Sequence, residues 1–442
     1  QRRYSSYIMR ESIYDVLCAL LLGIGQLCMF TGYDTQLTIV EPVLRSVHDR
    51  SPGTIDAHAG YYGPAVCMIV FTFANLVVPW AIGILGSKFS LVLGSMLFSV
   101  HIVTFFFIHS FPYYLTSATL GLGYALFYSG HGGYTTEHST RKTIGRNSAL
   151  TWALASMCMT VGGIVMLFTI QSPEIGNEIV QSTNMTAIGR SFREYSDGEI
   201  RMMYGAFLLV TVCSNAIFAA IPTRSVKDSI SKTKDCKNQP GFGHQLKRTF
   251  ATMGERKMLQ LTPLFGYIGL SSCIWVSVYP TTLTFSKKLS EYVYLPAYYS
   301  IAFGLSNMLM GFTISAISKR VKNFAQMPTL TIGSVSFATA MVLALLSTPT
   351  WATNTPTDEL TLLIEPNPYL PLFIAVLFGI GDNCVNTSRT VICALILPEK
   401  RVQVFAVSKF HQSLLLAALT FISPLIPMPV YSIVIILYSV VS

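Results

Sequence analysis

Residues 223–257 read TRSVKDSISKTKDCKNQPGFGHQLKRTFATMGERK, a polar and basic stretch between two long apolar regions. The stretch holds nine Lys and Arg residues, and its Gln-Pro-Gly-Phe-Gly sequence at 239–243 disfavours a continuous helix. Only residues 246–253 have the periodicity of a short interfacial helix. We interpret the stretch as a cytoplasmic linker that joins two halves of the chain, residues 1–222 and residues 258–442.

The composition indicates that the outer surface of both halves faces lipid. Of the 442 residues, 51% are hydrophobic and only 12% are charged, whereas globular proteins usually contain about 25% charged residues. This balance excludes a soluble cytosolic enzyme, a disordered chain and a coiled coil. The net charge of +9 fits the Lys and Arg excess of cytoplasmic loops better than it fits nucleic-acid binding.

Twelve apolar stretches are candidates for membrane-spanning helices, since about 20 apolar residues cross the hydrocarbon core. They cover residues 12–33, 61–84, 89–109, 112–131, 148–170, 201–222, 258–280, 296–317, 328–347, 369–391, 402–424 and 427–442. Six precede the linker and six follow it. This layout resembles the major facilitator superfamily, whose two six-helix halves enclose a central site. The sequence therefore predicts an all-α polytopic membrane protein with twelve transmembrane helices.

One superfamily feature is reduced in this chain. The usual motif between the second and third helices contains Gly, Asp and several Arg residues. The corresponding loop here supplies Gly83, Gly86 and Lys88 but no Asp. This departure speaks against ordinary transporter gating.

The distribution of basic residues predicts the orientation. With both termini in the cytoplasm, 22 Lys and Arg residues lie on the cytoplasmic side and 7 on the other. The Asn184-Met185-Thr186 sequon in the 171–200 loop then faces away from the cytoplasm and should carry a glycan. The sequon at Asn386 lies within the tenth helix and should stay unmodified. We expect an integral multi-pass protein of the plasma membrane or of an endomembrane.

Asp382 and Lys409, in the tenth and eleventh predicted helices, are the strongest candidates for a functional polar pair inside the membrane. A charge at the bilayer centre costs about 2.5 kcal/mol or more and normally has a partner or a wet cavity. Because a helix rises about 1.5 Å per residue, the depths of the two residues match and the side chains could meet. The pair is either a switchable ion pair or proton site, or a static pair that fixes helix register.

Several amides inside the predicted helices either line a cavity or pack between helices. Gly379 and Gly381, close to Asp382, allow close helix contact. The amide three residues after Lys409 shares its helix face. The six candidate amides are Gln26, Asn75, Asn307, Asn383, Asn386 and Gln412.

A polar motif follows the fourth predicted helix and is expected in a cytoplasmic loop. Its members are Glu137, Arg146, Asn147 and Ser148. Glu137 could pair with a nearby Arg, and Asn147 or Ser148 could cap the fifth helix. The alternative is a functional role, either as a cytoplasmic latch between parts of the chain or as a binding surface for a partner protein.

The sequence contains no catalytic triad, nucleotide-binding loop or set of metal ligands. Its nine Cys residues lie mostly in apolar runs and lack metal-binding spacing. We therefore predict no enzymatic activity, no cofactor, no metal and no nucleic-acid partner.

Four groups of residues resemble the unc-ninety-three-like branch of the major facilitator superfamily, and they are spread over both halves. The most specific is the Thr-Ile-Gly-Arg-Asn-Ser stretch at 143–148. The family frequently has an acidic residue at Asn307. The four groups are 137–140 with 143–148 and 152–154; 379–382 with Asn386 and Thr387; Phe405 and Ala406 with Lys409, Phe410, Gln412 and Ser413; and Asn75 and Leu76 with Pro79.

This resemblance implies a twelve-helix facilitator fold without established transport. Better understood members act as a regulatory subunit of a two-pore potassium channel or as a trafficking chaperone for Toll-like receptors, and others are orphan solute carriers. The resemblance favours a non-enzymatic regulator or trafficking partner of another membrane protein in the lipid bilayer, with a potassium channel as the favoured partner. The alternative is a secondary transporter of a small-molecule solute through a central cavity, which the Asp382–Lys409 pair favours.

Overall fold

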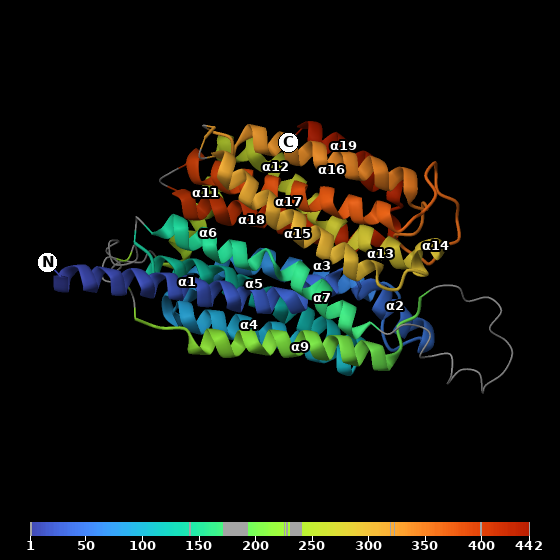
Figure 1. Cartoon of the computed structure of the whole chain (residues 1–442), viewed down its shortest axis with the longest axis horizontal. Coiled ribbons are helices and arrows are strands. Elements are labelled where there is room, and N and C mark those ends of the chain that lie inside the picture. Colours follow the sequence, from blue (N-terminus) through green and yellow to red (C-terminus); the bar gives the residue numbers. More distant parts are fainter. Residues whose placement is uncertain are drawn as a thin grey trace.

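The computed structural model describes residues 2–140, 143–170, 193–224, 226, 229, 241–318, 320–321, 323–397 and 400–441. Within these residues long helices run side by side along the longest axis of the molecule (Figure 1). The helices of the first part of the chain are α1 (Arg2–Leu37), α2 (Val40–Arg50), α3 (Ala59–Leu85), α4 (Ser87–Val103), α5 (Ser110–Glu137), α6 (Ile144–Ala155), α7 (Cys158–Thr169) and α9 (Asp197–Ala220).

The second part of the chain repeats this pattern of long helices with short connections. Its helices are α11 (Phe242–Met253), α12 (Arg256–Cys273), α13 (Tyr279–Phe285), α14 (Lys287–Ser290), α15 (Leu295–Ser318), α16 (Met327–Ser347), α17 (Tyr369–Ile396), α18 (Arg401–Ile422) and α19 (Met428–Val441). The short helix α11 covers the region where the sequence predicts an interfacial helix.

Most of the twelve predicted ranges coincide closely with helices in the described part of the chain. Ten helices there are long and apolar enough to cross a membrane, and the apolar α19 is shorter. The helix α5, which corresponds to the fourth predicted range, is not among the ten. The all-α, multi-span class is therefore confirmed, whereas the count of twelve spans is not.

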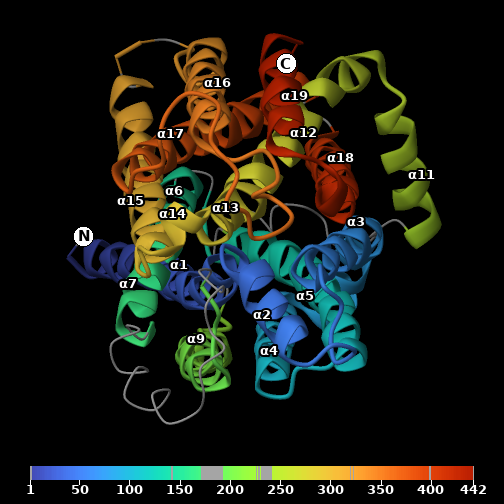
Figure 2. The same ribbon diagram turned by 90° about the vertical axis from the view of Figure 1, so that its right-hand side faces the viewer.

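Two pairs of helices form the most extensive contacts between the two parts of the chain. Helix α3 packs against α18, and α7 packs against α15. Figure 2, which looks along the bundle, shows α2, α4, α5 and α9 on one side and α12, α16 and α19 on the other. Helix α1 packs against three other helices of the first part of the chain, α6, α7 and α9.

Small residues bring α7 and α15 into very close contact. A Cβ added at Gly163 would lie 2.7 Å from the carbonyl oxygen of Ala297, and one at Gly304 would lie 2.4 Å from Thr160 Oγ1. A side chain at either glycine would push the two backbones apart. In a membrane, where helices cannot gain hydrophobic energy from one another, this close packing is a main source of helix association.

One end of the bundle is closed by contacts between the two parts of the chain. This end carries α2 and residues 348–368 (Figure 1). The buried Tyr61 at the start of α3 donates a hydrogen bond from its hydroxyl to the carbonyl oxygen of Thr353 at 2.6 Å. Nearer the middle, Thr72 Oγ1 donates to Ser413 Oγ at 2.8 Å and joins α3 to α18.

A wider helical turn interrupts the seventh predicted span. Residues Ile274–Val278 form a π-helical segment between α12 and α13. Pro280, in the first turn of α13, has no backbone N–H, so the ordinary ladder of hydrogen bonds cannot continue through it. The wider turn leaves the carbonyl oxygen of Trp275 free to accept a hydrogen bond from the Tyr299 hydroxyl at 2.7 Å. Such segments are often found at functional sites.

Candidate functional site

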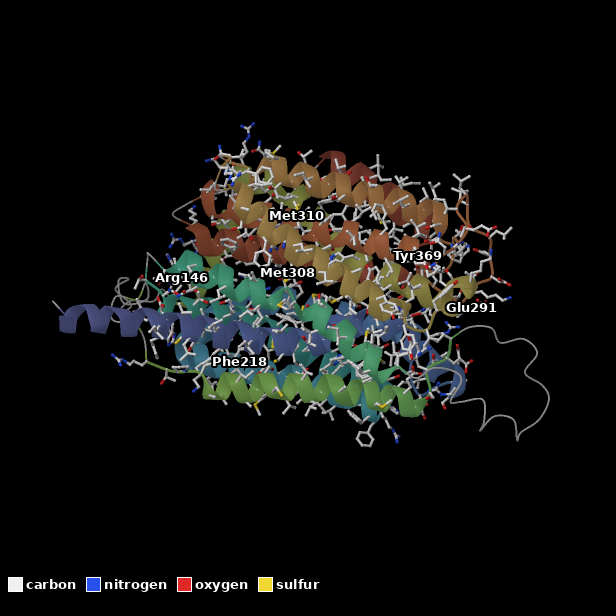
Figure 3. All side chains as sticks on the ribbon, viewed as in Figure 1. Arg146, Phe218, Glu291, Met308, Met310 and Tyr369 are labelled. Carbon is white, nitrogen blue, oxygen red and sulfur yellow. The ribbon has the colours of Figure 1, made fainter. Side chains whose placement is uncertain are left out.

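Asp382 on α17 is held by neutral donors from two helices. Asn307 Nδ2 of α15 donates to one carboxylate oxygen at 2.9 Å, and Asn386 Nδ2, one turn along α17, donates to the other at 2.9 Å. Asn383 Nδ2 donates to Asn307 Oδ1 at 3.1 Å. Three of the predicted amides thus surround the predicted aspartate. Met308, the residue after Asn307, lies between the two ends of the bundle (Figure 3).

Arg389 lies on the same face of α17 as Asp382, because the spacing Asp382, Asn386, Arg389 follows helical turns. The side chain is only 8% exposed. Its Nη1 donates to Gln412 Oε1 of α18, and its Nε has no partner within the described residues. Arg389 falls inside the tenth predicted span, 369–391, but was not among the predicted site residues; the helix α17 continues beyond this span to Ile396.

Lys409 on α18 lies over an aromatic ring of the other part of the chain. Its Nζ is 5.0 Å from the centre of the Tyr128 ring on α5, within the range of a cation–π interaction. Lys409 and Asp382 interact electrostatically, but no ion pair within 4.0 Å joins them. In the described part of the chain the Lys409 ammonium has no hydrogen-bond partner. The predicted pair thus shares one site without forming a direct salt bridge.

Asp34 brings a second carboxylate to this site from the last turn of α1. Among the described residues its oxygens accept only long contacts, from the Tyr124 hydroxyl at 3.4 Å and from the Cys158 thiol at 3.9 Å. Asp34 also interacts electrostatically with Asp382. Asp34 was not among the predicted site residues because the first predicted span ends at residue 33, whereas α1 continues to Leu37.

Tyr128 on α5 is close to charged groups from both parts of the chain. It interacts electrostatically with Asp34, Asp382 and Arg389 as well as with the Lys409 ammonium. We call Asp34, Tyr128, Asp382, Arg389 and Lys409 the central cluster. All of its members except Arg389 are only half-buried, although they lie inside the bundle. The central cluster therefore combines two carboxylates and two cations with surface that a small molecule could contact.

An aromatic stack borders the central cluster. The indole of Trp275, in the π-helical segment, lies parallel to the ring of Phe303, with centroids 4.0 Å apart. The indole is close to the Asp382 carboxylate, but its Nε1 makes no hydrogen bond of normal geometry. The stack gives the polar site one flat apolar wall.

Gln26 and Asn75 are not joined to the central cluster by hydrogen bonds within the described residues. Gln26 lies two turns before Asp34 on α1 and is 1% exposed, and neither atom of its amide group has a partner. Asn75 on α3 is also buried, and its Nδ2 has no partner.

The predicted loop motif is mainly helical. Glu137 is the last residue of α5 and accepts a hydrogen bond from Ser87 Oγ at 2.8 Å; no arginine among the described residues pairs with it. Arg146, Asn147 and Ser148 lie within α6, which begins at Ile144. The helix begins earlier than predicted because the side chains and backbones of Thr140 and Thr143 bond to one another.

The partners of the α6 residues hold the end of the bundle near the N-terminus together. Arg146 Nη2 forms an ion pair with Asp15 of α1 at 2.9 Å. Asn147 Nδ2 donates to Ser139 Oγ at 3.0 Å, so Asn147 does not cap the helix. Figure 3 shows Arg146 at this end and Glu291 and Tyr369 at the other. The predicted glycosylation site, Asn184, lies outside the described residues.

Comparison with known families identifies the chain. The family model described as "Ion channel regulatory protein UNC-93" matches residues 51–442. The chain belongs to the UNC-93 family. Two relatives are named "UNC93-like protein MFSD11": the protein of Xenopus laevis is 26% identical over 432 residues, and that of Xenopus tropicalis is 26% identical over 424 residues. In both comparisons the match covers 92% of this chain and 90% of the relative.

Solved transporter structures share the fold of this UNC-93 family member. The nucleoside transporter NupG superposes with a TM-score of 0.59 at 13% identity, covering 97% of this chain and 96% of NupG. FucP, a Major Facilitator Superfamily transporter in the outward conformation, gives a TM-score of 0.56 at 10% identity and covers 97% of both chains. The predicted major facilitator fold is thereby confirmed. The description of the family model names an ion channel regulator, and both of these solved structures are transporters.

Proposed function

We propose that this chain is a secondary transporter that binds a small polar solute at the central cluster. The observation that carries the proposal is the convergence of charges from both parts of the chain. Asp34 comes from the first part, whereas Asp382, Arg389 and Lys409 come from the second. In transporters of this fold, solute sites lie near the bilayer midplane between the two repeats.

The energetic cost of this arrangement supports a role beyond packing. Each charge at membrane depth costs at least about 2.5 kcal/mol unless it is paired or wet. A purely structural core would pair the cations and carboxylates directly, yet Asp382 is held by amides and Lys409 by a ring. Because these charged groups do not pair directly with one another and most of them are partly exposed, they are suited to pair with the charged groups of a ligand.

The test is uptake from a natural mixture of solutes. The purified full chain would be reconstituted into liposomes, incubated with a deproteinised cell extract, and the liposome contents analysed by mass spectrometry. We expect at least one solute to accumulate with the wild-type chain and not with Asp382→Asn or with empty liposomes. Accumulation of no solute in a chain-dependent manner would contradict the proposal.

The second candidate function is regulation or trafficking of another membrane protein, with a potassium channel as the favoured partner. The description of the matching family model, which names an ion channel regulatory protein, favours it. Purification in mild detergent tests this candidate: a channel that co-purifies in stoichiometric amount would support it. A chain that purifies alone, and transports a solute, would exclude it as the main function.

We also propose the organisation that the sequence predicts. Residues 1–222 and 258–442 form two six-helix halves, residues 223–257 form a cytoplasmic linker, and both termini lie in the cytoplasm. The excess of Lys and Arg residues on the corresponding loops supports this orientation. Protease added from the cytosolic side of permeabilised cells should cleave the linker. Protection of the linker would contradict the proposed topology.

A further inference from the structure

We infer that the solute of the central cluster is a zwitterion that carries a carboxylate and an ammonium group, as an amino acid does. This inference rests on the proposed transport function and assigns its substrate class. In this assignment Lys409 and Arg389 hold the carboxylate of the solute, and Asp34 holds its ammonium group.

The cations of the central cluster have unused donors. The Lys409 ammonium has three N–H groups and lies over the Tyr128 ring, and within the described residues this ammonium forms no hydrogen bond or ion pair. Arg389 is 8% exposed, donates to Gln412 through Nη1, and leaves Nε without a partner. A buried donor without an acceptor is costly, so a ligand carboxylate between the two cations would be strongly favoured.

The carboxylate of Asp34, which also interacts electrostatically with Tyr128, is the complementary feature of the central cluster. Its two contacts, 3.4 Å to a phenol oxygen and 3.9 Å to a thiol sulfur, are weak for an ionised group. Asp382 differs, because two amide donors at 2.9 Å satisfy both of its oxygens. Asp34 is therefore the acidic group that still lacks a strong donor, and an ammonium group supplies one.

Other classes of solute satisfy the central cluster less well. A neutral polar solute leaves both cations without a charged acceptor. A simple anion leaves Asp34 weakly bonded, and a simple cation adds to the repulsion between Lys409 and Arg389. A zwitterion supplies a carboxylate to the two cations and an ammonium group to Asp34. It also adds no net charge to a site that already has two positive and two negative groups.

The experiment measures the thermal unfolding of the purified full chain with matched probes. The probes are the standard amino acids, β-alanine and 4-aminobutyrate, each compared with its carboxamide and with its deaminated acid. Removing either charge removes a charge-assisted contact, which weakens binding about 10- to 150-fold. We therefore expect at least one amino acid to raise the melting temperature, and neither of its two analogues to do so at the same concentration.

Variants assign each end of the solute to a residue. Lys409→Met should abolish the preference for the amino acid over its carboxamide, and Asp34→Asn should abolish the preference over the deaminated acid. Lys287→Met and Asp358→Asn make the same chemical changes at an exposed ion pair far from the central cluster and should leave both preferences unchanged.

Three outcomes would overturn the inference. The first is stabilisation by an acid or amide as strong as that by its amino acid, and the second is an absence of stabilisation by every amino acid tested. The third is an unchanged preference in folded Lys409→Met and Asp34→Asn chains. Uptake of a different class of solute from the cell extract would leave the proposed transport function standing while this substrate class fails.

Discussion

The ammonium of Lys409 lies 5.0 Å from the centre of the Tyr128 ring, so a cation of α18 faces an aromatic ring of α5. The two residues belong to different parts of the chain, and the contact therefore depends on how the two parts sit against each other. Lys409 is kept from a direct salt bridge with Asp382, whose oxygens are already taken by Asn307 and Asn386.

The separation of Asp382 and Lys409 predicts a weak direct coupling between them. Asp382→Asn should destabilise the chain by about 1–3 kcal/mol, because its new amide hydrogens would face the donor of Asn307 or Asn386. Adding Lys409→Met should recover only a small part of this loss. A double-mutant cycle on thermal unfolding measures the coupling, and Asp358→Asn at an exposed ion pair is the control. Full recovery in the double variant would show a direct pair instead.

Close packing at Gly379 predicts a strong effect of a single methyl group. A Cβ there would lie 2.1 Å from Ser306 Oγ and 2.4 Å from the carbonyl oxygen of Phe303. Gly379→Ala should separate α15 from α17 and cost about 1–3 kcal/mol, as overpacking usually does. Gly132→Ala on α5 is the matched control, because nothing lies within 4 Å of its added Cβ. The monodisperse yield in detergent should fall for the first variant only; equal yields would contradict this prediction.

The hydrogen bond from Tyr61 to Thr353 predicts how the closed end opens. Tyr61→Phe removes this buried bond between α3 and residues 348–368, which is worth about 0.5–1.5 kcal/mol. Hydrogen exchange at residues 351–357 should become faster. Tyr62→Phe is the control, since the Tyr62 ring packs against His58 and Phe421 but its hydroxyl makes no hydrogen bond in the described residues. Equal exchange in the two variants would show that this bond does not hold the end closed.

Burial of Glu41 predicts a dependence of stability on pH. Glu41 on α2 lies outside the membrane-spanning segments, and its burial raises its pKa, although His58 and Arg45 partly oppose the shift. Because the folded chain then holds this proton more tightly than the unfolded chain, the Glu41 contribution to stability is greatest below about pH 4.5 and is lost as the pH rises through the raised pKa.

The corresponding variant is Glu41→Gln, which stays uncharged at every pH. The difference in melting temperature between this variant and the wild type should grow in favour of the variant from acidic to neutral pH. Differential scanning fluorimetry over this range measures it. A constant difference would show that Glu41 does not change its protonation state in the way that its burial indicates.

The sequon at Asn184 predicts one glycan if the 171–200 loop faces away from the cytoplasm. The chain made in animal cells should lose one glycan-sized mass on glycosidase treatment, and Asn184→Gln should remove the same mass. Asn386 should carry none, because its side-chain amide is bonded to Asp382 inside the bundle. A glycan on Asn386 would contradict the proposed topology.

The helical fold could be predicted from the sequence because each membrane-spanning helix corresponds to a long apolar stretch. Apolar stretches of about 20 residues recur along the chain, and the basic segment 223–257 separates two sets of them. Asp382 and its amides were also within reach, since a charged residue surrounded by Asn and Gly in an apolar run is rare. Local sequence thus indicated the elements and one side of the central cluster.

Asp34, Arg389 and Tyr128, unlike Lys409, were missed because of their positions in the sequence. Asp34 and Arg389 lie near the ends of apolar runs, where the hydropathy pattern cannot tell a last helical turn from a loop. Their helices continue to Leu37 and Ile396 because the following residues are still compatible with a helix. Tyr128 carries no local signal, because only the packing of α5 near α18 brings its ring to Lys409.

Trp275, which stacks on Phe303, provides an intrinsic fluorescent probe of the central cluster. The chain has four Trp residues, and Trp80, Trp152 and Trp351 are 37%, 51% and 44% exposed. Trp275 is the half-buried one, and it lies beside Asp382 at the π-helical turn. A chain that retains only this indole carries a built-in fluorophore whose emission maximum follows the charge and hydration of its surroundings. Occupation of the central cluster could then be followed in real time without attaching a dye.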